Sequence, residues 1–184
     1  GSGAAGPALR ARFSARDLIG VDASSEMLAK AADLGAFDRL DQADIVGWNP
    51  ESPPALIYSN AALHWLPDHE TLIPRLFATL VVGGALAIQM PSQLNRPSHQ
   101  SLIEAAVSVR PDLFSGWTPF PGHLEPAAYA DLLSDAEMEL WTTEYHQRLP
   151  ASPDSAHPVR RFSSSTAGRP VLSRLSAEET TAFN

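Results

Sequence analysis

The chain has 184 residues, of which 44% are hydrophobic and 18% charged, a composition that fits one folded domain of ordinary size. Its 13 lysines and arginines against 21 acidic residues give a net charge of −8, which disfavours nonspecific binding to nucleic acid or anionic membranes. The absence of cysteine excludes disulfides, thiolate catalysis and cysteine metal sites. No apolar run reaches the roughly 18 residues of a membrane span, and no signal-peptide pattern occurs, so we expect a cytoplasmic protein.

The start of the chain combines glycines with a predicted helix and strand. The opening GSGAAG matches G-x-G-x-x-G, Pro7 suits the first turn of a helix over 8–13, and the apolar run 18–21 ends at Asp22. Such glycines let a ligand approach the backbone, and an acidic residue about 20 positions on can accept hydrogen bonds from ribose hydroxyls. The pattern favours a nucleotide-like ligand, with a flexible glycine tail as the alternative.

A helix and a short strand are predicted next. Ser24 is a capping residue ahead of strong helix formers that run to Ala32. Residues 40–46 predict a strand region, with Asp44 and Ile45 at its end. Asp44 can be a ligand contact or, equally well, a turn or capping residue.

Residues 55–91 organise the chain. The run 56–58 predicts a buried strand, apolar residues at helical spacing between 72 and 80 predict a helix ended by the glycines at 83–84, and 85–90 predicts a second strand. Two buried strands joined by a helix form a βαβ unit of a parallel sheet, in which ligands bind at the carboxyl ends of the strands. We therefore expect the active site in the loop after the first strand, which carries Asn60, His64 and Trp65.

From Pro91 the pattern changes to a region punctuated by prolines, with an aromatic-rich loop over 114–120. Beyond Pro150 the chain is rich in serine and proline and only weakly patterned, and its last residues are typical of a helix. The elements predicted in this half are helices over 98–107 and 126–136, a long alternating strand over 137–149, and a helix over 169–175.

Five segments carry a resemblance to a known family: GVDASSEMLAKA, ADI, LIYSNAALHWLPDHETLIPRL, GGALAIQMP and WTTEYHQRLP. They resemble the trans-aconitate 2-methyltransferase family, which belongs to the class I S-adenosylmethionine (SAM)-dependent methyltransferases. GVDAS marks only the superfamily, whereas SNAALHWLPD together with AIQMP is more specific. The resemblance covers residues 18–150 and, more weakly, the TAGRP segment at 166–170.

The resemblance implies an α/β fold, with a Rossmann-like class I methyltransferase sheet, helices on both faces and a mainly helical cap. It implies a SAM-binding domain over 1–150, with an insertion over the site at 92–125, and a partial helical cap segment over 151–184. The family's central first strand and its last strand have no counterpart in this sequence, and its glycine pattern is only partly matched. A chain truncated at both ends is therefore expected.

The resemblance also implies SAM as the cofactor. Gly1 and Gly3 would contact the methionine part of SAM, and Asp22 with Ala23 would contact its ribose. Asp44 and Ile45 would border the adenine, and Asn60 and Ala61 would lie beside the sulfonium end.

The implied reaction is methylation of a carboxylate of a small polycarboxylic acid, with trans-aconitate as the first candidate. Carboxyl groups ionise near pH ~4, so no general base is needed, and Asn60 and His64 would only position the reactants. Arginine, histidine, tyrosine and tryptophan donors suit the remaining carboxylates of the substrate. The candidates, each of which can also be explained by packing, capping or surface charge, are His64, Trp65, Arg96, His99, Tyr145, His146 and Arg169.

Three alternatives stay open. The same fold suits methylation of another small molecule, the glycines with Asp22 also suit NAD(P), and an inactive fragment that serves as a binding surface is the non-enzymatic possibility. We expect a monomer whose partner is a small anionic substrate, with no nucleic acid or membrane partner. The six histidines lack zinc-site spacing, so no metal is expected.

Overall fold

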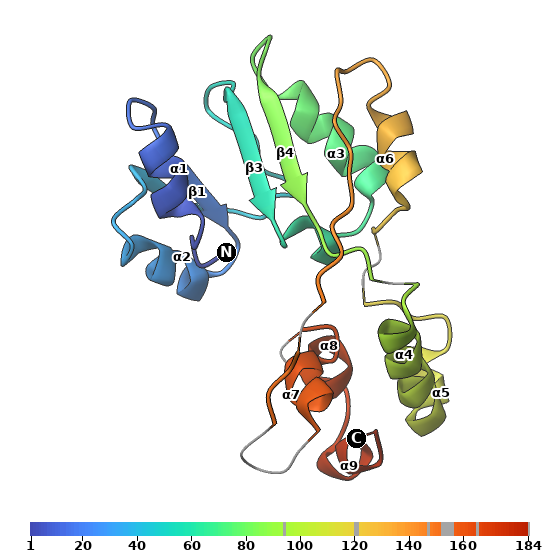
Figure 1. The fold of residues 1–184 in the computed structure, drawn as a ribbon. Helices are drawn as coiled ribbons and strands as arrows, with labels where there is room; N and C mark the ends of the chain where they lie inside the picture. The colour runs from blue at the N-terminus through green and yellow to red at the C-terminus, as the bar shows by residue number, and fades with distance from the viewer. Residues whose placement is uncertain (94, 120–121, 147, 152–156, 165, 184) are drawn as a thin grey trace. The chain divides into compact units, whose positions relative to one another are not determined.

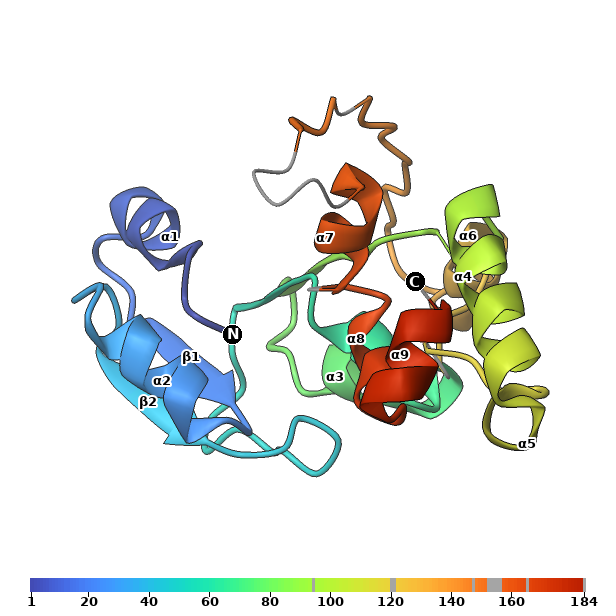
Figure 2. The ribbon, with the colours of Figure 1, turned by 90° about the horizontal axis from the view of Figure 1, so that it is seen from below.

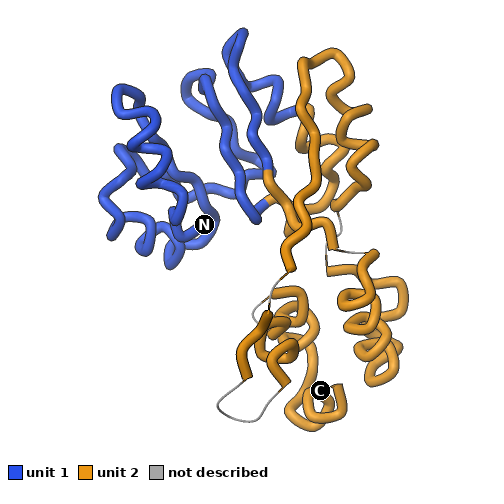
Figure 3. The backbone as a smooth tube through the Cα atoms, viewed as in Figure 1, with its two compact units in different colours: residues 1–62, 75–88 blue, residues 63–74, 89–184 orange. Residues whose placement is uncertain are grey.

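The computed structural model describes residues 1–93, 95–119, 122–146, 148–151, 157–164 and 166–183. The chain divides into two compact units (Figure 3). Unit 1 comprises Gly1–Ala62 and Arg75–Ile88, and unit 2 comprises Leu63–Pro74 and Gln89–Asn184. Unit 1 carries the described strands, whereas unit 2 is built mainly from helices (Figures 1 and 3).

Unit 1 begins with two helices and two strands: α1 (Gly6–Arg12), β1 (Ile19–Asp22), α2 (Ser25–Ala32) and β2 (Arg39–Gln42). The two strands pair in parallel, with Asp22 opposite Gln42 at their carboxyl ends, and α2 packs on the pair (Figure 2). The hydroxyl of Ser24 accepts a hydrogen bond from the Met27 N–H at 3.3 Å and caps α2. The predicted helices and the first strand of this region are confirmed.

A set of hydrogen bonds around Asp38 ties three stretches of unit 1 together. The Asp38 carboxylate accepts from the Leu18 N–H at 2.7 Å and from the Arg10 guanidinium. Arg10 also donates to the carbonyls of Ala36, at 3.0 Å, and Arg16, at 2.8 Å. The hydrogen bonds from Leu18 and Arg10 hold the pKa of Asp38 below its ordinary value.

The second strand pair consists of β3 (Leu56–Asn60) and β4 (Ala85–Gln89), joined through α3 (His69–Ala78). The arrows of β3 and β4 run side by side in the same direction (Figure 1), so the predicted parallel βαβ unit is confirmed. Gly83 follows α3 with a φ of +78°, a backbone conformation that glycine adopts without strain. The buried face of α3 consists of Leu72, Ile73 and Leu76.

Unit 2 is built mainly from helices and contains a small apolar cluster. Besides the first turns of α3, its described elements are η1 (Leu63–Trp65), α4 (Pro97–Val109), α5 (Pro111–Phe114), α6 (Pro126–Leu132), α7 (Pro158–Ser164), α8 (Arg169–Leu172) and α9 (Ala177–Phe183). The cluster consists of buried Ala106, Phe114 and Val171, with partly buried side chains such as Trp117 and Leu175 packed against it. The helices predicted in this half are confirmed with changed ends, whereas α5 and α7 were not predicted.

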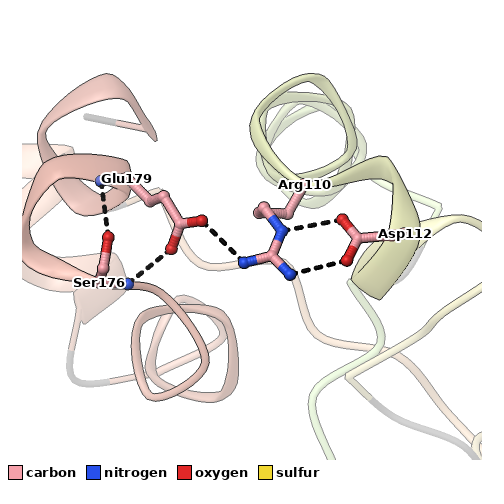
Figure 4. Close-up of polar contacts among 4 residues, drawn as sticks. All are labelled: Arg110, Asp112, Ser176 and Glu179. Atoms are coloured by element: carbon pink, nitrogen blue, oxygen red, sulfur yellow. Dashed lines mark hydrogen bonds and ion pairs between the residues drawn. The ribbon is translucent and has the colours of Figure 1, made fainter.

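Arg110 links two helical stretches of unit 2 that are far apart in the sequence (Figure 4). Its Nε and Nη2 donate to the Asp112 carboxylate at 2.8 and 2.7 Å, and its Nη1 donates to Glu179 at 2.7 Å. Glu179 also accepts from the Ser176 N–H at 2.7 Å, while the Ser176 hydroxyl accepts from the Glu179 N–H at 3.2 Å. This reciprocal pair is a capping box at the start of α9.

Two strand predictions differ from the structure. The strand β2 ends at Gln42 instead of reaching Val46, because the Asp44 carboxylate accepts the Val46 N–H at 2.9 Å and turns the chain. Within the described part of 137–149 no strand forms, and Trp141 is 74% exposed. Alternation stabilises a strand only where a neighbouring strand supplies hydrogen bonds and one face is covered. The predicted strand 137–149 is therefore wrong.

The chain is thus a mixed α/β protein with parallel strand pairs, as predicted. The described strands form two separate two-stranded sheets, β1–β2 and β3–β4. A single sheet with helices on both faces, a cap over the site and a domain boundary at Pro150 stay predictions.

Candidate functional site

Asp22, the predicted ribose contact, lies at the carboxyl end of β1. Its Oδ1 accepts from the Ser24 N–H at 2.7 Å, and its Oδ2 pairs with the amine of Gly1. Burial raises the pKa of Asp22, but the hydrogen bonds from the amine and from Ser24 outweigh it, and the pKa lies below its ordinary value. Asp22 is therefore an ionised acceptor at neutral pH. Ala23 beside it is exposed, and its carbonyl accepts from the Gln42 side chain at 3.2 Å.

Gly3 brings the start of the chain close to α2. It has a φ of +74°, and a Cβ placed on it would lie 2.8 Å from the Ala31 Cβ and 2.8 Å from the Phe37 ring. Both the conformation and the close approach require glycine. Around Gly1 there is no comparable packing, because a Cβ there would meet nothing within 4 Å among the described residues.

The residues between β2 and β3 that carry the predicted adenine contacts form the 43–50 loop. Asp44 is exposed and Ile45 is half-buried. The Asp44 side chain accepts from the Val46 N–H at 2.9 Å, and its carbonyl accepts from the Gly47 N–H at 3.1 Å. The turn role predicted as one alternative for Asp44 is therefore confirmed.

The tip of β3 carries the residues predicted for the reacting end of the cofactor. Asn60 is the last residue of the strand and is exposed. Ala61 follows with a φ of +50°, in the left-handed region that residues other than glycine seldom adopt. The hydroxyl of Ser59 is buried and has no hydrogen-bond partner among the described residues. Backbone strain and an unsatisfied buried hydroxyl, here two residues apart, are common at ligand-binding loops.

In unit 2, a chain of hydrogen bonds through His69 holds the η1 turn. The Nε2 of His69 lies 2.8 Å from the Leu63 carbonyl, and its Nδ1 lies 2.6 Å from the hydroxyl of Tyr129, which accepts from the Leu124 N–H at 3.1 Å. Since a carbonyl only accepts, Nε2 carries the proton and Nδ1 accepts from Tyr129. Burial raises the pKa of Tyr129, which keeps this donor protonated.

His64 and Trp65, both predicted to contact substrate, lie together on η1 with ring centroids 4.5 Å apart. His64 is only 4% exposed, and burial, together with repulsion from His123 and His69, lowers the pKa of His64 to about 4. At neutral pH the imidazole is uncharged and would meet a carboxylate as a hydrogen-bond donor. Trp65 is 42% exposed, which argues against core packing as its role.

Arg96 and His99 meet at the start of α4. Arg96 holds the N-cap position and is exposed, and its carbonyl accepts from the His99 N–H at 3.0 Å. The capping role considered for His99 is therefore wrong. His99 is half-buried in the first turn, and burial lowers its pKa.

The other predicted substrate residues lie on separate segments of unit 2. Tyr145 is 77% exposed and His146 is also exposed, both in the irregular stretch after α6. Packing in the interior is thereby excluded for both. Arg169 is exposed at the first position of α8.

Sequence reasoning missed four side chains that shape these regions: Arg75, His69, His123 and Tyr129. Arg75, in unit 1, donates from Nη2 to the Ile45 carbonyl at 2.5 Å and from Nη1 to the Trp48 carbonyl at 2.7 Å. His69 lies five residues after His64 in the sequence, and this closeness could have indicated that it belongs to the same region. Arg75 and Tyr129 bind partners that are far away in the sequence, so no local sequence pattern indicates these contacts.

Chemically, the predicted cofactor residues offer the two carboxylates of Asp22 and Asp44, main-chain groups and the Asn60 amide, which suit hydrogen bonding to a nucleoside. Among the described residues, no cluster of three histidine or acidic side chains is arranged to hold a metal ion. In the same residues, no helix combines the length and apolarity needed to cross a membrane.

No protein-family model matches the chain. Individual proteins, however, are similar to it over most of its length. The trans-aconitate 2-methyltransferase of Methylobacterium radiotolerans is 40% identical over 181 residues, which cover 95% of this chain and 68% of the relative. The enzymes of the same name from Klebsiella pneumoniae and an Azoarcus species are 37% and 38% identical, over 95% and 90% of this chain and 67% and 64% of their own lengths. The chain therefore belongs to the trans-aconitate 2-methyltransferase family.

Proposed function

We propose that the chain is a SAM-dependent O-methyltransferase that methylates a carboxylate of a small polycarboxylic acid, with trans-aconitate as its substrate. The observation that carries this proposal is membership of a family whose relatives named above are trans-aconitate 2-methyltransferases. A second support is independent of the family: an ionised aspartate at the tip of a parallel strand, Asp22, is suited to a ribose diol.

The residues of unit 1 fit a nucleoside-bearing methyl donor. Asp22 would hold the ribose hydroxyls, with Ala23 alongside, and the backbone around Gly1 and Gly3 would line the methionine part. Asp44 and Ile45 on the 43–50 loop would border the adenine, and Asn60 with Ala61 would lie at the reacting end. The Ser59 hydroxyl near the β3 tip, which is buried without a hydrogen-bond partner among the described residues, supports a polar ligand there.

The chain's own residues need only bind, orient and exclude water. When bound, SAM would supply an electrophilic methyl group to the substrate carboxylate oxygen, with its sulfur as the leaving group. Carboxylates are ionised well above pH ~4, so no side chain has to remove a proton. Asn60 and His64 would act by alignment, since an oxygen held about 3–3.5 Å from the methyl carbon is close to its attack position.

The remaining carboxylates of the substrate require donors. His64, uncharged at neutral pH because of its lowered pKa, would donate a hydrogen bond, and the partly exposed ring of Trp65 would cover the substrate. The cationic donors proposed for the other carboxylates are Arg96 and Arg169, with His99, Tyr145 and His146 as further contacts.

The wider architecture proposed with this function is a Rossmann-like sheet with helices on both faces, capped by residues 92–125 and 151–184. We propose that the enzyme works as a monomer in the cytoplasm.

The test is a methyl-transfer assay with isotope-labelled SAM and a panel that contains trans-aconitate, citrate and a simple monocarboxylate. We expect label to enter trans-aconitate as a base-labile ester. Calorimetric titration with SAM and with NAD runs in parallel. Binding of NAD without SAM, or label transfer to the monocarboxylate but not to trans-aconitate, would overturn the proposal.

A further inference from the structure

Arg75 reaches from α3 to the 43–50 loop, which lies 30 residues earlier in the chain. Its Nη2 donates to the Ile45 carbonyl at 2.5 Å and its Nη1 donates to the Trp48 carbonyl at 2.7 Å, and both contacts are partly buried. The two acceptors stand three residues apart on the same loop. One rigid guanidinium therefore fixes both sides of the bend.

Arg75 joins the loop to another element, which the loop's own turn hydrogen bonds do not do. Two of its hydrogen bonds are local: the Val46 N–H donates to the Asp44 side chain at 2.9 Å, and the Gly47 N–H donates to the Asp44 carbonyl at 3.1 Å. These bonds define the shape of a turn but not its position. An arginine stays charged at all physiological pH values and presents several donors in a fixed plane, so it suits this task.

The loop also continues directly from the strand ends that carry the predicted ribose contact. Asp22 stands opposite Gln42 in the parallel pair, and the Ala43 N–H donates to the Asp22 carbonyl at 3.1 Å. The position of Asp44 and Ile45 relative to Asp22 is thus set at one end by this strand pairing. At the other end it is set by Arg75.

We propose that Arg75 is a positioning residue for the cofactor: by holding the 43–50 loop, it preorganises the edge that would face the adenine. This inference rests on the proposed function, and it adds a residue outside the predicted contacts. A preformed loop spares the ligand the free energy of ordering it, so Arg75 acts on cofactor affinity and not on methyl transfer itself.

The variants are Arg75→Met, which keeps much of the side-chain bulk and removes every donor, and Arg75→Lys, which keeps the charge but cannot donate to both carbonyls as a fork. The matched control is Arg12→Met. Arg12 is an exposed arginine of the same unit, at the last position of α1.

The first measurement is amide hydrogen exchange without any ligand. In Arg75→Met we expect the Val46 and Gly47 amides to exchange roughly tenfold faster, because local opening of the loop costs less. In Arg12→Met their exchange should stay within about twofold of that of the unaltered chain. Unchanged exchange in Arg75→Met overturns the inference, whether or not the chain binds SAM.

The second measurement is the dissociation constant for SAM and, with acceptor present, the KM for SAM and kcat. We expect Arg75→Met to raise both constants by about tenfold, the lower end of what charged hydrogen bonds contribute, with kcat at saturation within about twofold. Arg75→Lys should fall between Arg75→Met and the unaltered chain, and it supplies the test if Arg75→Met does not fold. Equal SAM affinity in the Arg75 variants and the control overturns the inference, whereas failure of the unaltered chain to bind SAM overturns the proposed function instead.

Discussion

Asp22 is a single side chain on which the cofactor proposal can be tested directly. Its carboxylate is ionised at neutral pH and lies at the tip of β1. We expect Asp22→Ala to weaken SAM binding by about tenfold or more, given roughly 1.5–3 kcal/mol for hydrogen bonds to a charged group. Calorimetric titration measures this change. Asp33→Ala, at an exposed residue just after α2, is the matched control and should bind normally; equal affinity in the two variants would remove Asp22 from the site.

Tyr129 is the residue on which the His69 chain depends. Its hydroxyl donates to the Nδ1 of His69 and accepts from the Leu124 N–H. Tyr129→Phe leaves both groups without this partner, so we expect a loss of about 1–3 kcal/mol in the free energy of unfolding. Urea titration measures it. Tyr145→Phe alters a ring that is 77% exposed and should change stability by less than about 0.5 kcal/mol; similar losses in both variants would contradict the proposed chain.

Among the secondary-structure elements, α9 offers the clearest test, because a capping box and an ion pair meet at its first turn. We expect Ser176→Ala to cost about 1 kcal/mol, the usual effect of losing a capping hydroxyl. Ser108→Ala is the control, since its exposed hydroxyl donates back to the Glu104 carbonyl within α4 and its loss should be neutral or slightly stabilising. Thermal unfolding followed by circular dichroism distinguishes them, and a Ser176→Ala chain as stable as Ser108→Ala would show that the box contributes nothing.

Sequence patterns predicted the elements well where the information is local. The cap at Ser24 and the apolar spacing of α3 gave helices within a few residues of their observed bounds. The prediction is wrong for 137–149, where the alternation is typical of a strand although no partner strand pairs with the described residues. Alternation reports which face a strand would bury, but not whether a neighbour is present to bind its backbone.

For the whole molecule, His64 predicts how stability responds to acid. The pKa of His64 is lowered to about 4 in the folded chain. In the unfolded chain the imidazole becomes protonated near pH ~6.5, whereas in the folded chain it becomes protonated only near pH 4. The contribution of uncharged His64 to the free energy of unfolding is therefore fully present above about pH 6.5, and it decreases as the pH falls toward 4. The expected loss is roughly 1–3 kcal/mol.

Urea titrations at pH 7.5 and pH 4.5 measure this loss, and His64→Gln, which has no titrating ring, should show a smaller decrease between them. The carboxylates with lowered pKa values, Asp38, Asp112 and Glu179, lose their stabilising contribution only in more acid solution, below about pH 4. Equal decreases in His64→Gln and the unaltered chain would show that His64 does not titrate as described.

The sequence by itself determined the family, the parallel α/β character and most helix positions, because motifs, caps and apolar spacing are local properties. It also indicated Asp22 and the tip of β3 as candidate cofactor residues. Only the tertiary structure decided that Arg75 holds the 43–50 loop, that Tyr129 and His69 hold η1, and that His64 is buried. These contacts join residues whose separation is fixed by packing, and side-chain burial and long-range hydrogen bonds leave no periodic trace in a sequence.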